Sequence, residues 1–205
     1  MADLPARVRA VHDGLQPLSP VEPSGCLVRS VRGADRAFGC VGIGGDRLHQ
    51  HQGAPLGGGR KRGAFAQGLG TSRGGRTSKV HALTDEQGRP RVLLISPGNT
   101  SDMVMAPALI EAAHGRFTKL IADRGYDSNA IRAAVQAQGA EVVMPSTRSR
   151  KTPLPYDRET YRARNLVERL WCRLKDWRRV ATRYDKLARN YMAGVLLAAS
   201  LTYWC

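Results

Sequence analysis

Four residues with metal-binding or phosphate-binding chemistry follow one another at helical spacing in the C-terminal half of the chain. Intervals of three, four and seven positions separate Tyr161, Arg164, Glu168 and Lys175. On a helix of 3.6 residues per turn this spacing places all four side chains on one side. The carboxylate is a hard oxygen ligand for a divalent cation, and its basic neighbours suit phosphate. The alternative is a solvated helix face stabilised by charge pairs.

A second carboxylate, Asp123, comes directly after an apolar strand predicted over Phe117 to Ala122. A side chain at that point reaches the exposed edge of a sheet, where functional residues gather. Asp123 also precedes Gly125, so the alternative is an aspartate that only forms a turn.

The elements that must position these acids are predicted from residue 63 onward. The turn Asp85–Gly88 joins two strands, and the serines and glycines that flank the next segments are typical helix caps. The expected order is strands at Thr77–Leu83 and Arg91–Ile95, a helix at Thr100–Ala113, a strand at Phe117–Ala122, a helix at Ser128–Gln138, a strand at Glu141–Met144, and helices at about Arg158–Val180 and Leu187–Trp204. This order predicts an α/β fold, a mixed sheet with helices packed against it.

Both C-terminal helices carry core residues. In the first, an apolar side is predicted from Leu166, Leu170, Leu174 and Trp177, with Val167 and Trp171 at its flank. The second is apolar but falls short of the ~20 residues that span a bilayer, so we interpret it as a core element.

Residues 1–62 differ in composition from the rest of the chain. They hold 11 of the 22 glycines and 5 of the 11 prolines. The stretch Gly39–Gly45 is too rich in glycine to predict a strand, and Gly57–Arg62 has the composition of a flexible basic link. We therefore divide the chain into a segment of low order, 1–62, and a domain, 63–205, which is incomplete because its first strand is not recognisable.

The motifs of the second part resemble those of bacterial insertion-sequence DDE transposases, which have an RNase H-like catalytic core. The resemblance covers about residues 63–205 and rests on five motifs in order: Gly70–Asp85, Gly98–Asp102, Ile121–Asp127, the Tyr161-x2-Arg164-x3-Glu168-x6-Lys175 signature, and Arg183–Asn190. It implies an RNase H-like mixed sheet flanked by helices.

The resemblance also implies a chemistry and a set of residues. Three carboxylates would hold two divalent cations, Mg²⁺ or Mn²⁺, for DNA cleavage and strand transfer at the ends of an insertion sequence. Asp123 would be the second acid and Glu168 the third. Arg164 and Lys175 would contact DNA phosphate, and Tyr161 would lie beside the strand. The motif Gly70–Asp85 looks like the family's basic strand-entry motif. It adds three DNA-binding candidates, Arg73, Arg76 and Lys79.

Three other polar residues have simpler interpretations. Asp102 could assist the site, but an acid in the first turn of a helix explains it equally well. His81 is interpreted as a strand packing residue, and Asp127 as a cap for the helix that begins near Ser128.

The first acid of the family should lie on the first strand, and no convincing candidate is present. Only Asp46 is near, and its surroundings do not resemble the family. Residues 45–55 can, however, be encoded by codons that, read one nucleotide later, give Ala-Ile-Asp-Ser-Thr-Ser-Thr-Lys-Ala-His-Arg, which resembles the family's first catalytic strand. Our hypothesis is that residues 1 to about 60 are translated out of the family's frame. A −1 ribosomal slip near Arg60–Arg62 would join the frames; alternatively, the element has decayed.

Charge points to the same class of partner. The chain has 32 Lys and Arg against 17 Asp and Glu, a net charge of +15, which predicts a polyanion partner. We expect double-stranded DNA as the partner, a homo-oligomer in an active complex, no membrane, and a cytoplasmic, nucleoid-associated location. The isolated chain is expected to be inactive, and the alternatives are a non-catalytic DNA-binding regulator or an inactive remnant.

Overall fold

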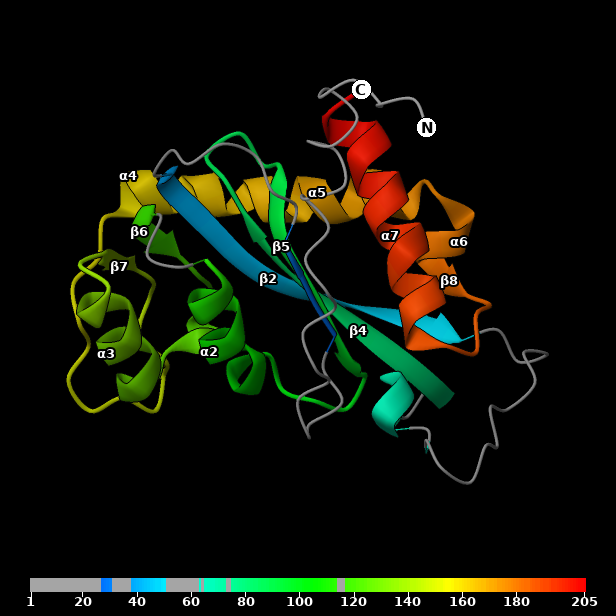
Figure 1. Cartoon of the computed structure of the whole chain (residues 1–205). Coiled ribbons are helices and arrows are strands. Elements are labelled where there is room, and N and C mark those ends of the chain that lie inside the picture. The colour runs from blue at the N-terminus through cyan, green and yellow to red at the C-terminus, as the bar shows by residue number, and fades with distance from the viewer. Residues whose placement is uncertain (1–26, 31–37, 51–62, 64, 73–74, 114–116) are drawn as a thin grey trace, which may run out of the picture.

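A single mixed sheet organises the part of the chain that this computed structural model describes: residues 27–30, 38–50, 63, 65–72, 75–113 and 117–205. The path of neighbouring strands is β1-β5-β4-β2-β6-β7, with β3 on β4 and β8 on β2 (Figure 1). The strands are β1 (Leu27–Ser30), β2 (Phe38–Gln50), β3 (Gly70–Ser72), β4 (Gly75–Thr84), β5 (Pro90–Pro97), β6 (Phe117–Ile121), β7 (Glu141–Val143) and β8 (Thr182–Arg183).

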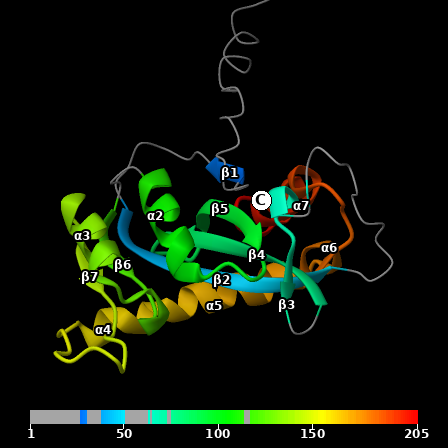
Figure 2. The ribbon, with the colours of Figure 1, turned by 90° about the horizontal axis from the view of Figure 1, so that it is seen from below.

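Helices cover both faces of this sheet. They are α2 (Asp102–Ala112), α3 (Asn129–Ala137), α4 (Arg158–Tyr161), α5 (Asn165–Lys175), α6 (Arg178–Ala181) and α7 (Ala188–Tyr203), with 3₁₀ turns at η1 (Phe65–Gln67), η2 (Arg124–Tyr126) and η3 (Arg162–Arg164). Figure 2 shows α5 running beneath the sheet while α2 lies above it. The α/β mixed sheet flanked by helices that the motifs predicted is confirmed.

Alternating residues of β4 and β5 feed two separate cores. Leu83, Val92 and Leu94 pack with α2 and α3, whereas the intervening positions pack with α5 and α7. Val80 pairs with Ile95 and Ala82 with Leu93 on that second face. The period-2 alternation of strand side chains therefore fixes which helices lie on which face.

Short-range signals set the boundaries of the middle elements. Asp85 accepts hydrogen bonds from the backbone N–H groups of Gln87 (3.0 Å) and Arg89 (2.9 Å), and Gly88 has a φ of 78° that favours glycine. Ser101 and Ser128 cap α2 and α3 through their hydroxyls. The predicted turn and both predicted helix starts are confirmed.

The predicted absence of a strand over Gly39–Gly45 is wrong, because β2 runs through these residues at the centre of the sheet. It pairs antiparallel with β4 and parallel with β6 and β8. Its glycines are accommodated by neighbours that take the space of the missing side chains: a Cβ at Gly42 or Gly44 would lie 2.6 Å from a methyl of Val167. The predicted link Gly57–Arg62 lies outside the described residues.

The long helix predicted over 158–180 is also divided. It forms α4, η3, α5 and α6. Trp177, which was predicted on the apolar side of the helix, is instead the N-cap residue of α6 and is 42% exposed. Leu170 and Leu174 are buried as predicted, and so are the flanking Val167 and Trp171, but Leu166 is only partly buried. The final helix, α7, buries Tyr191, Met192 and Val195 but exposes Leu197 and Leu201. Among the described residues, no helix has the length and apolar character to cross a bilayer.

Two glycines provide a matched test of packing. A methyl on Gly98 would lie 2.7 Å from Thr77 Cβ and 2.9 Å from its carbonyl carbon, so Gly98→Ala is expected to lower the free energy of unfolding by about 1–3 kcal/mol. A methyl on Gly194, within α7, meets nothing within 4 Å, so Gly194→Ala is expected to raise it by about 0.5–1 kcal/mol. Urea denaturation of both variants checks this; equal effects would contradict the packing at Gly98.

Candidate active site

Asp123 lies at the carboxyl end of β6, half-buried, where the chain turns into η2. Its Oδ1 accepts a hydrogen bond from the N–H of Gly125 at 2.7 Å. Its Oδ2 has no hydrogen bond to any described residue. The turn-forming interpretation and the metal-ligand interpretation are therefore compatible, since one oxygen holds the turn and the other accepts no hydrogen bond from the described residues.

Glu168 projects from the first half of α5 on its solvent side. Its side chain is 59% exposed, and Oε1 accepts a hydrogen bond from Arg164 Nη2 at 2.5 Å. An exposed i,i+4 pair of this kind contributes little to stability. The carboxylate can therefore change partners at small cost.

Tyr161 connects the two acids. Burial raises the pKa of its phenol, the nearby Arg164 lowers it, and Asp123 raises it further. The ring of Tyr156 meets that of Tyr161 edge to face, with centroids 5.4 Å apart. The structure thus brings Asp123, Tyr161, Arg164 and Glu168 into one region. Lys175 is exposed at the other end of α5, seven residues or about 10 Å from Glu168.

The three candidates of the strand-entry motif lie elsewhere. Arg76 is exposed at the start of β4, at the end of the sheet opposite Asp123. Arg73 lies outside the described residues. Lys79 is 5% exposed, and its Nζ donates to the carbonyl of Thr100 at 2.9 Å and pairs with Asp102 Oδ1 at 3.1 Å. The predicted DNA contact of Lys79 is therefore inconsistent with the structure, because its ammonium is enclosed between β4 and the start of α2.

Lys79 belongs to a polar cluster with Asp102 and His81 on the α2 face of the sheet. His81 is fully buried; its Nε2 lies 2.7 Å from Ser96 Oγ and its Nδ1 lies 3.4 Å from Asp102 Oδ1. His81 is a strand packing residue, as expected, but it packs through polar contacts. Asp102 is in the first turn of α2, as expected, and it also links that helix to β4.

This cluster predicts a pH dependence of stability. Burial lowers the pKa of His81, although Asp102 opposes the shift. Because the unfolded chain binds this proton more readily, the contribution of neutral His81 is complete above its ordinary pKa, about 6.5, and is lost as the pH falls below it. Urea unfolding between pH 8 and 5 should show wild-type stability falling by up to about 1.4 kcal/mol per pH unit more than that of His81→Gln. Parallel curves would contradict this.

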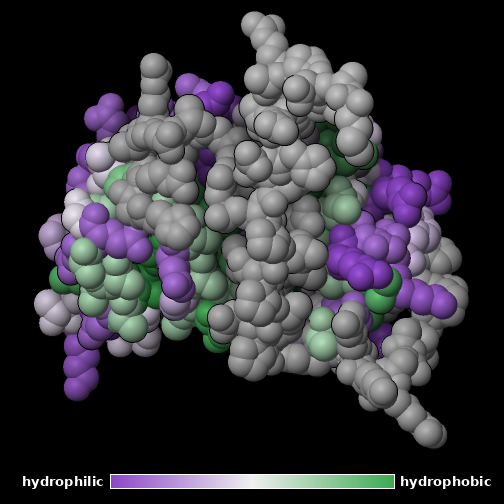
Figure 3. Space-filling model, viewed as in Figure 1, coloured by the Kyte–Doolittle hydropathy of each residue, from purple (hydrophilic) through white to green (hydrophobic). Residues whose placement is uncertain are grey.

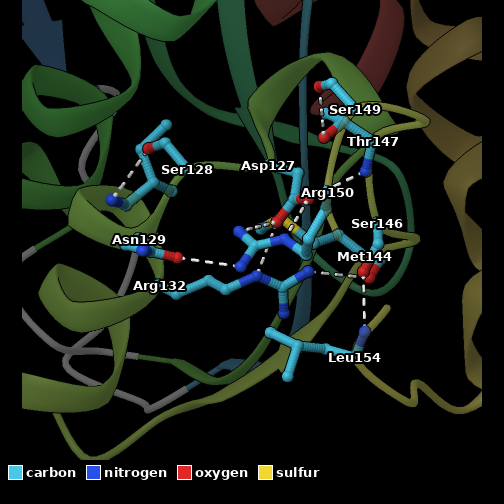
Figure 4. A network of polar contacts seen from close by, with 11 residues as sticks. Asp127, Ser128, Asn129, Arg132, Met144, Ser146, Thr147, Ser149, Arg150 and Leu154 are labelled. Carbon is cyan, nitrogen blue, oxygen red and sulfur yellow. Dashed lines mark hydrogen bonds and ion pairs between the residues drawn. The ribbon is translucent and has the colours of Figure 1, made fainter. Parts of the chain in front are cut away.

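Asp127 is the centre of a second network (Figure 4). Its buried carboxylate accepts hydrogen bonds from Arg132 Nε at 2.7 Å, Arg150 Nε at 2.9 Å and the N–H of Thr147 at 2.8 Å. Burial acts to raise the pKa of Asp127, but these donors outweigh it and hold the pKa well below its ordinary value. The predicted role as a helix cap is wrong, since Ser128 caps α3; Asp127 instead ties α3 to the loop after β7.

The described residues do not complete a three-carboxylate site. They contain no group of three His, Cys, Asp or Glu side chains placed to hold a metal ion. On β2, Gly42 pairs with Ile121, two residues before Asp123, and Gly44 lies against Val167, next to Glu168. The residues of β2 that lie beside Asp123 and Glu168 are therefore glycines, which offer no side chain to a metal ion. Asp46 pairs with Val80 farther along β2.

The comparisons with known proteins decide the family. A sequence profile described as "Transposase DDE domain" matches residues 47–203. The chain belongs to this transposase family. The match begins at residue 47, before residue 63, where the domain was predicted to start.

Two relatives found by sequence agree with this assignment. The chain is 30% identical over 130 residues to a putative transposase for insertion sequence element IS6501 from Brucella ovis, covering 62% of this chain and 98% of that protein. It is 29% identical over 137 residues to a putative transposase for insertion sequence element IS402 from Burkholderia cepacia, covering 62% of this chain and 63% of that protein. The catalytic core domain of BIV integrase aligns with a TM-score of 0.44 and 15% identity, over 81% of this chain and 84% of that one.

DDE transposases generally use divalent metal ions. In this transposase chain the described side chains, which do not include that of Asp46, offer no third acid beside Asp123 and Glu168. These described residues alone therefore do not fit a complete two-metal centre.

Proposed function

We propose that this chain is the catalytic portion of an insertion-sequence transposase that cleaves DNA and transfers strands at the element's ends. The observation that carries the proposal is the convergence of Asp123 and the Tyr161–Arg164–Glu168 set, in a chain that matches the DDE family over residues 47–203. Asp123 and Glu168 would serve as ligands for Mg²⁺ or Mn²⁺. Arg164, Arg76 and Lys175 would bind phosphate, together with Arg73; Tyr161 would hold the phosphate-binding side of α5 against β6.

We further propose that the isolated chain is inactive because its first acid is missing. Glycines occupy β2 where it passes Asp123 and Glu168, which supports another amino-acid sequence on this strand as the source of the third ligand. A shifted reading frame over residues 1 to about 60 would supply it. The DNA sequence tests this directly: the frame one nucleotide later must encode an Asp-Ser-Thr-like strand over residues 43–56.

The non-catalytic alternative is a DNA-binding regulator that competes for the element's ends. The net charge of +15 and the incomplete acid set favour it. It predicts salt-sensitive binding to DNA that carries the element's ends. It also predicts no cleavage, either by this chain or by a protein in which residues 1 to about 60 are translated in the alternative frame, which we call the frame-restored protein. A decayed remnant would instead show no cooperative unfolding transition.

A cleavage assay separates these functions. The chain and a frame-restored protein would each be incubated with duplexes carrying the element's ends, with Mg²⁺, Mn²⁺ or EDTA. Cation-dependent nicking by the restored protein alone is expected. In cells such a protein would be cytoplasmic and associated with the nucleoid, and an active complex would contain more than one copy.

A further inference from the structure

A second basic surface lies at the end of the sheet opposite Asp123. We call it the distal basic surface; its members are Arg76, Arg178, Arg179, Lys186 and Arg189, all exposed. Three interactions bring these segments together. Strand β8 pairs with the last residues of β2, Arg183 Nη1 contacts Ser78 Oγ at 2.5 Å, and the N–H of Ala188 donates to Gln67 Oε1 at 3.0 Å.

This surface is not organised to satisfy its own charges. Between Arg173 and Asn190 there are seven basic residues and two acidic ones. The side chains of Arg178, Lys186 and Arg189 have no partner among the described residues. Arg179 pairs with Asp185 at 3.2 Å, but it is 76% exposed, so this pair contributes little and can be exchanged.

Arg183 shows what a structural arginine in the same segment looks like. It is fully buried, its guanidinium lies over the ring of Tyr191, and it donates to the carbonyls of Asp185 (3.0 Å) and Lys186 (3.2 Å). The exposed arginines make no comparable set of bonds. Their charge is therefore available to an external partner.

The N-terminus of α7 also favours the binding of an anion at this surface. Its first turn carries Arg189 and no acidic residue, and Leu187 provides no side-chain cap. A cation at the positive end of a helix dipole is unfavourable by a few tenths of a kcal/mol or more in the free protein. A bound phosphate would reverse that cost.

Helix α5 connects this surface with the candidate active site. In Figure 1 it runs from α4, beside β6, to α6, beside β8, and Figure 3 shows strongly hydrophilic side chains over the α6 end. Along β2, five residues separate Gly44, which is level with Asp123 in the parallel register, from His49, the partner of Thr182. At about 3.3 Å per residue these two positions are ~17 Å apart. One DNA strand places a phosphate every 3.4 Å, so the span equals about five base pairs.

We propose that the distal basic surface binds the phosphate backbone of duplex DNA about five base pairs from the phosphate held at Asp123 and Glu168. The inference rests on the proposed function, since it places a second part of the same DNA end. A rigid duplex carries phosphates at regular intervals along a straight separation of this length, whereas the charges of an acidic protein have no fixed spacing.

The test measures binding of a labelled 20-bp DNA duplex by fluorescence anisotropy at several NaCl concentrations in EDTA. The full chain is compared with Arg178→Gln/Arg189→Gln and with the charge-retaining control Arg178→Lys/Arg189→Lys. Loss of two phosphate contacts should reduce the slope of log K against log salt by about 1.8, and weaken binding by one to two orders of magnitude at 0.1 M salt. The lysine control should keep most of the slope, because it keeps both charges.

Each outcome has a defined meaning. Wild-type affinity and slope in a glutamine double variant with unchanged thermal unfolding would overturn the inference. A loss seen with a 20-bp RNA duplex but not with DNA would overturn it too. If either of these outcomes is found and the frame-restored protein still cleaves DNA, the proposed function stands without the distal basic surface. A full chain that binds no duplex contradicts both the proposed function and this inference.

Discussion

Replacement of Asp127 by alanine is expected to lower the free energy of unfolding by about 3 kcal/mol. The change removes the carboxylate that pairs with Arg132 and Arg150 and leaves these cations without their partner. Breaking a buried pair by removing one member typically costs 3–5 kcal/mol. The lower end applies because the Arg150 side chain is 19% exposed and can turn toward water.

Urea denaturation at pH 7 measures this effect, with Glu141→Gln as the matched control. Glu141 also loses an ion pair, with Lys119 at 3.0 Å, but its side chain is 54% exposed, so a change of at most about 1 kcal/mol is expected. Equal losses in the two variants would show that burial does not distinguish them.

The same residue predicts an acid-dependent loss of stability. Because the pKa of Asp127 is held below its ordinary value near 4, its contribution is present above that value and is lost as the pH falls through the range below it. The difference in stability between wild type and Asp127→Ala should therefore shrink in acid below pH 4. A constant difference would contradict the charge pairing.

Cleavage by the frame-restored protein should fall about a thousandfold or more in Asp123→Asn and in Glu168→Gln. Each change replaces a carboxylate oxygen by an amide and so removes a hard, charged cation ligand. A thousandfold corresponds to about 4 kcal/mol of activation free energy, a reasonable size for loss of one charged ligand.

Nicking of end DNA measures this effect, with Glu111→Gln, an exposed residue of α2, as the control of unchanged activity. If instead the 205-residue chain cleaves robustly and Asp123→Asn abolishes the activity, the first acid must already be present. Asp46→Asn would then identify it.

The sequence was most informative where local signals specify the structure. Strands β4 to β7 and helices α2 and α3 agree with prediction to within about three residues, because the Asp85–Gly88 turn and the Ser101 and Ser128 caps act over a few positions. The breaks at Arg162–Arg164 and before Trp177 were missed, since no proline or glycine marks them.

The remaining differences depend on contacts between distant segments. The prediction for β2 failed because Val167, more than 120 residues later, fills the space above its glycines. The position of Lys79 in a strand could be predicted from the sequence. The enclosure of its ammonium could not, because it depends on Asp102 at the start of α2. Asp127 precedes a helix and so resembles a cap, but its partner Arg150 lies 23 positions away. The catalytic candidates Asp123 and Glu168, in contrast, came from motif spacing.

The close fit of β2 against its neighbours limits which residues this strand can carry. An aspartate introduced at Gly42 or Gly44 would meet Val167, and one at Gly45 would meet Asp102 and His81, each at under 3 Å from its Cβ. Each of these substitutions therefore requires a second change among the neighbouring side chains. An acid on this strand is thus expected to be tolerated only at positions beyond these three glycines.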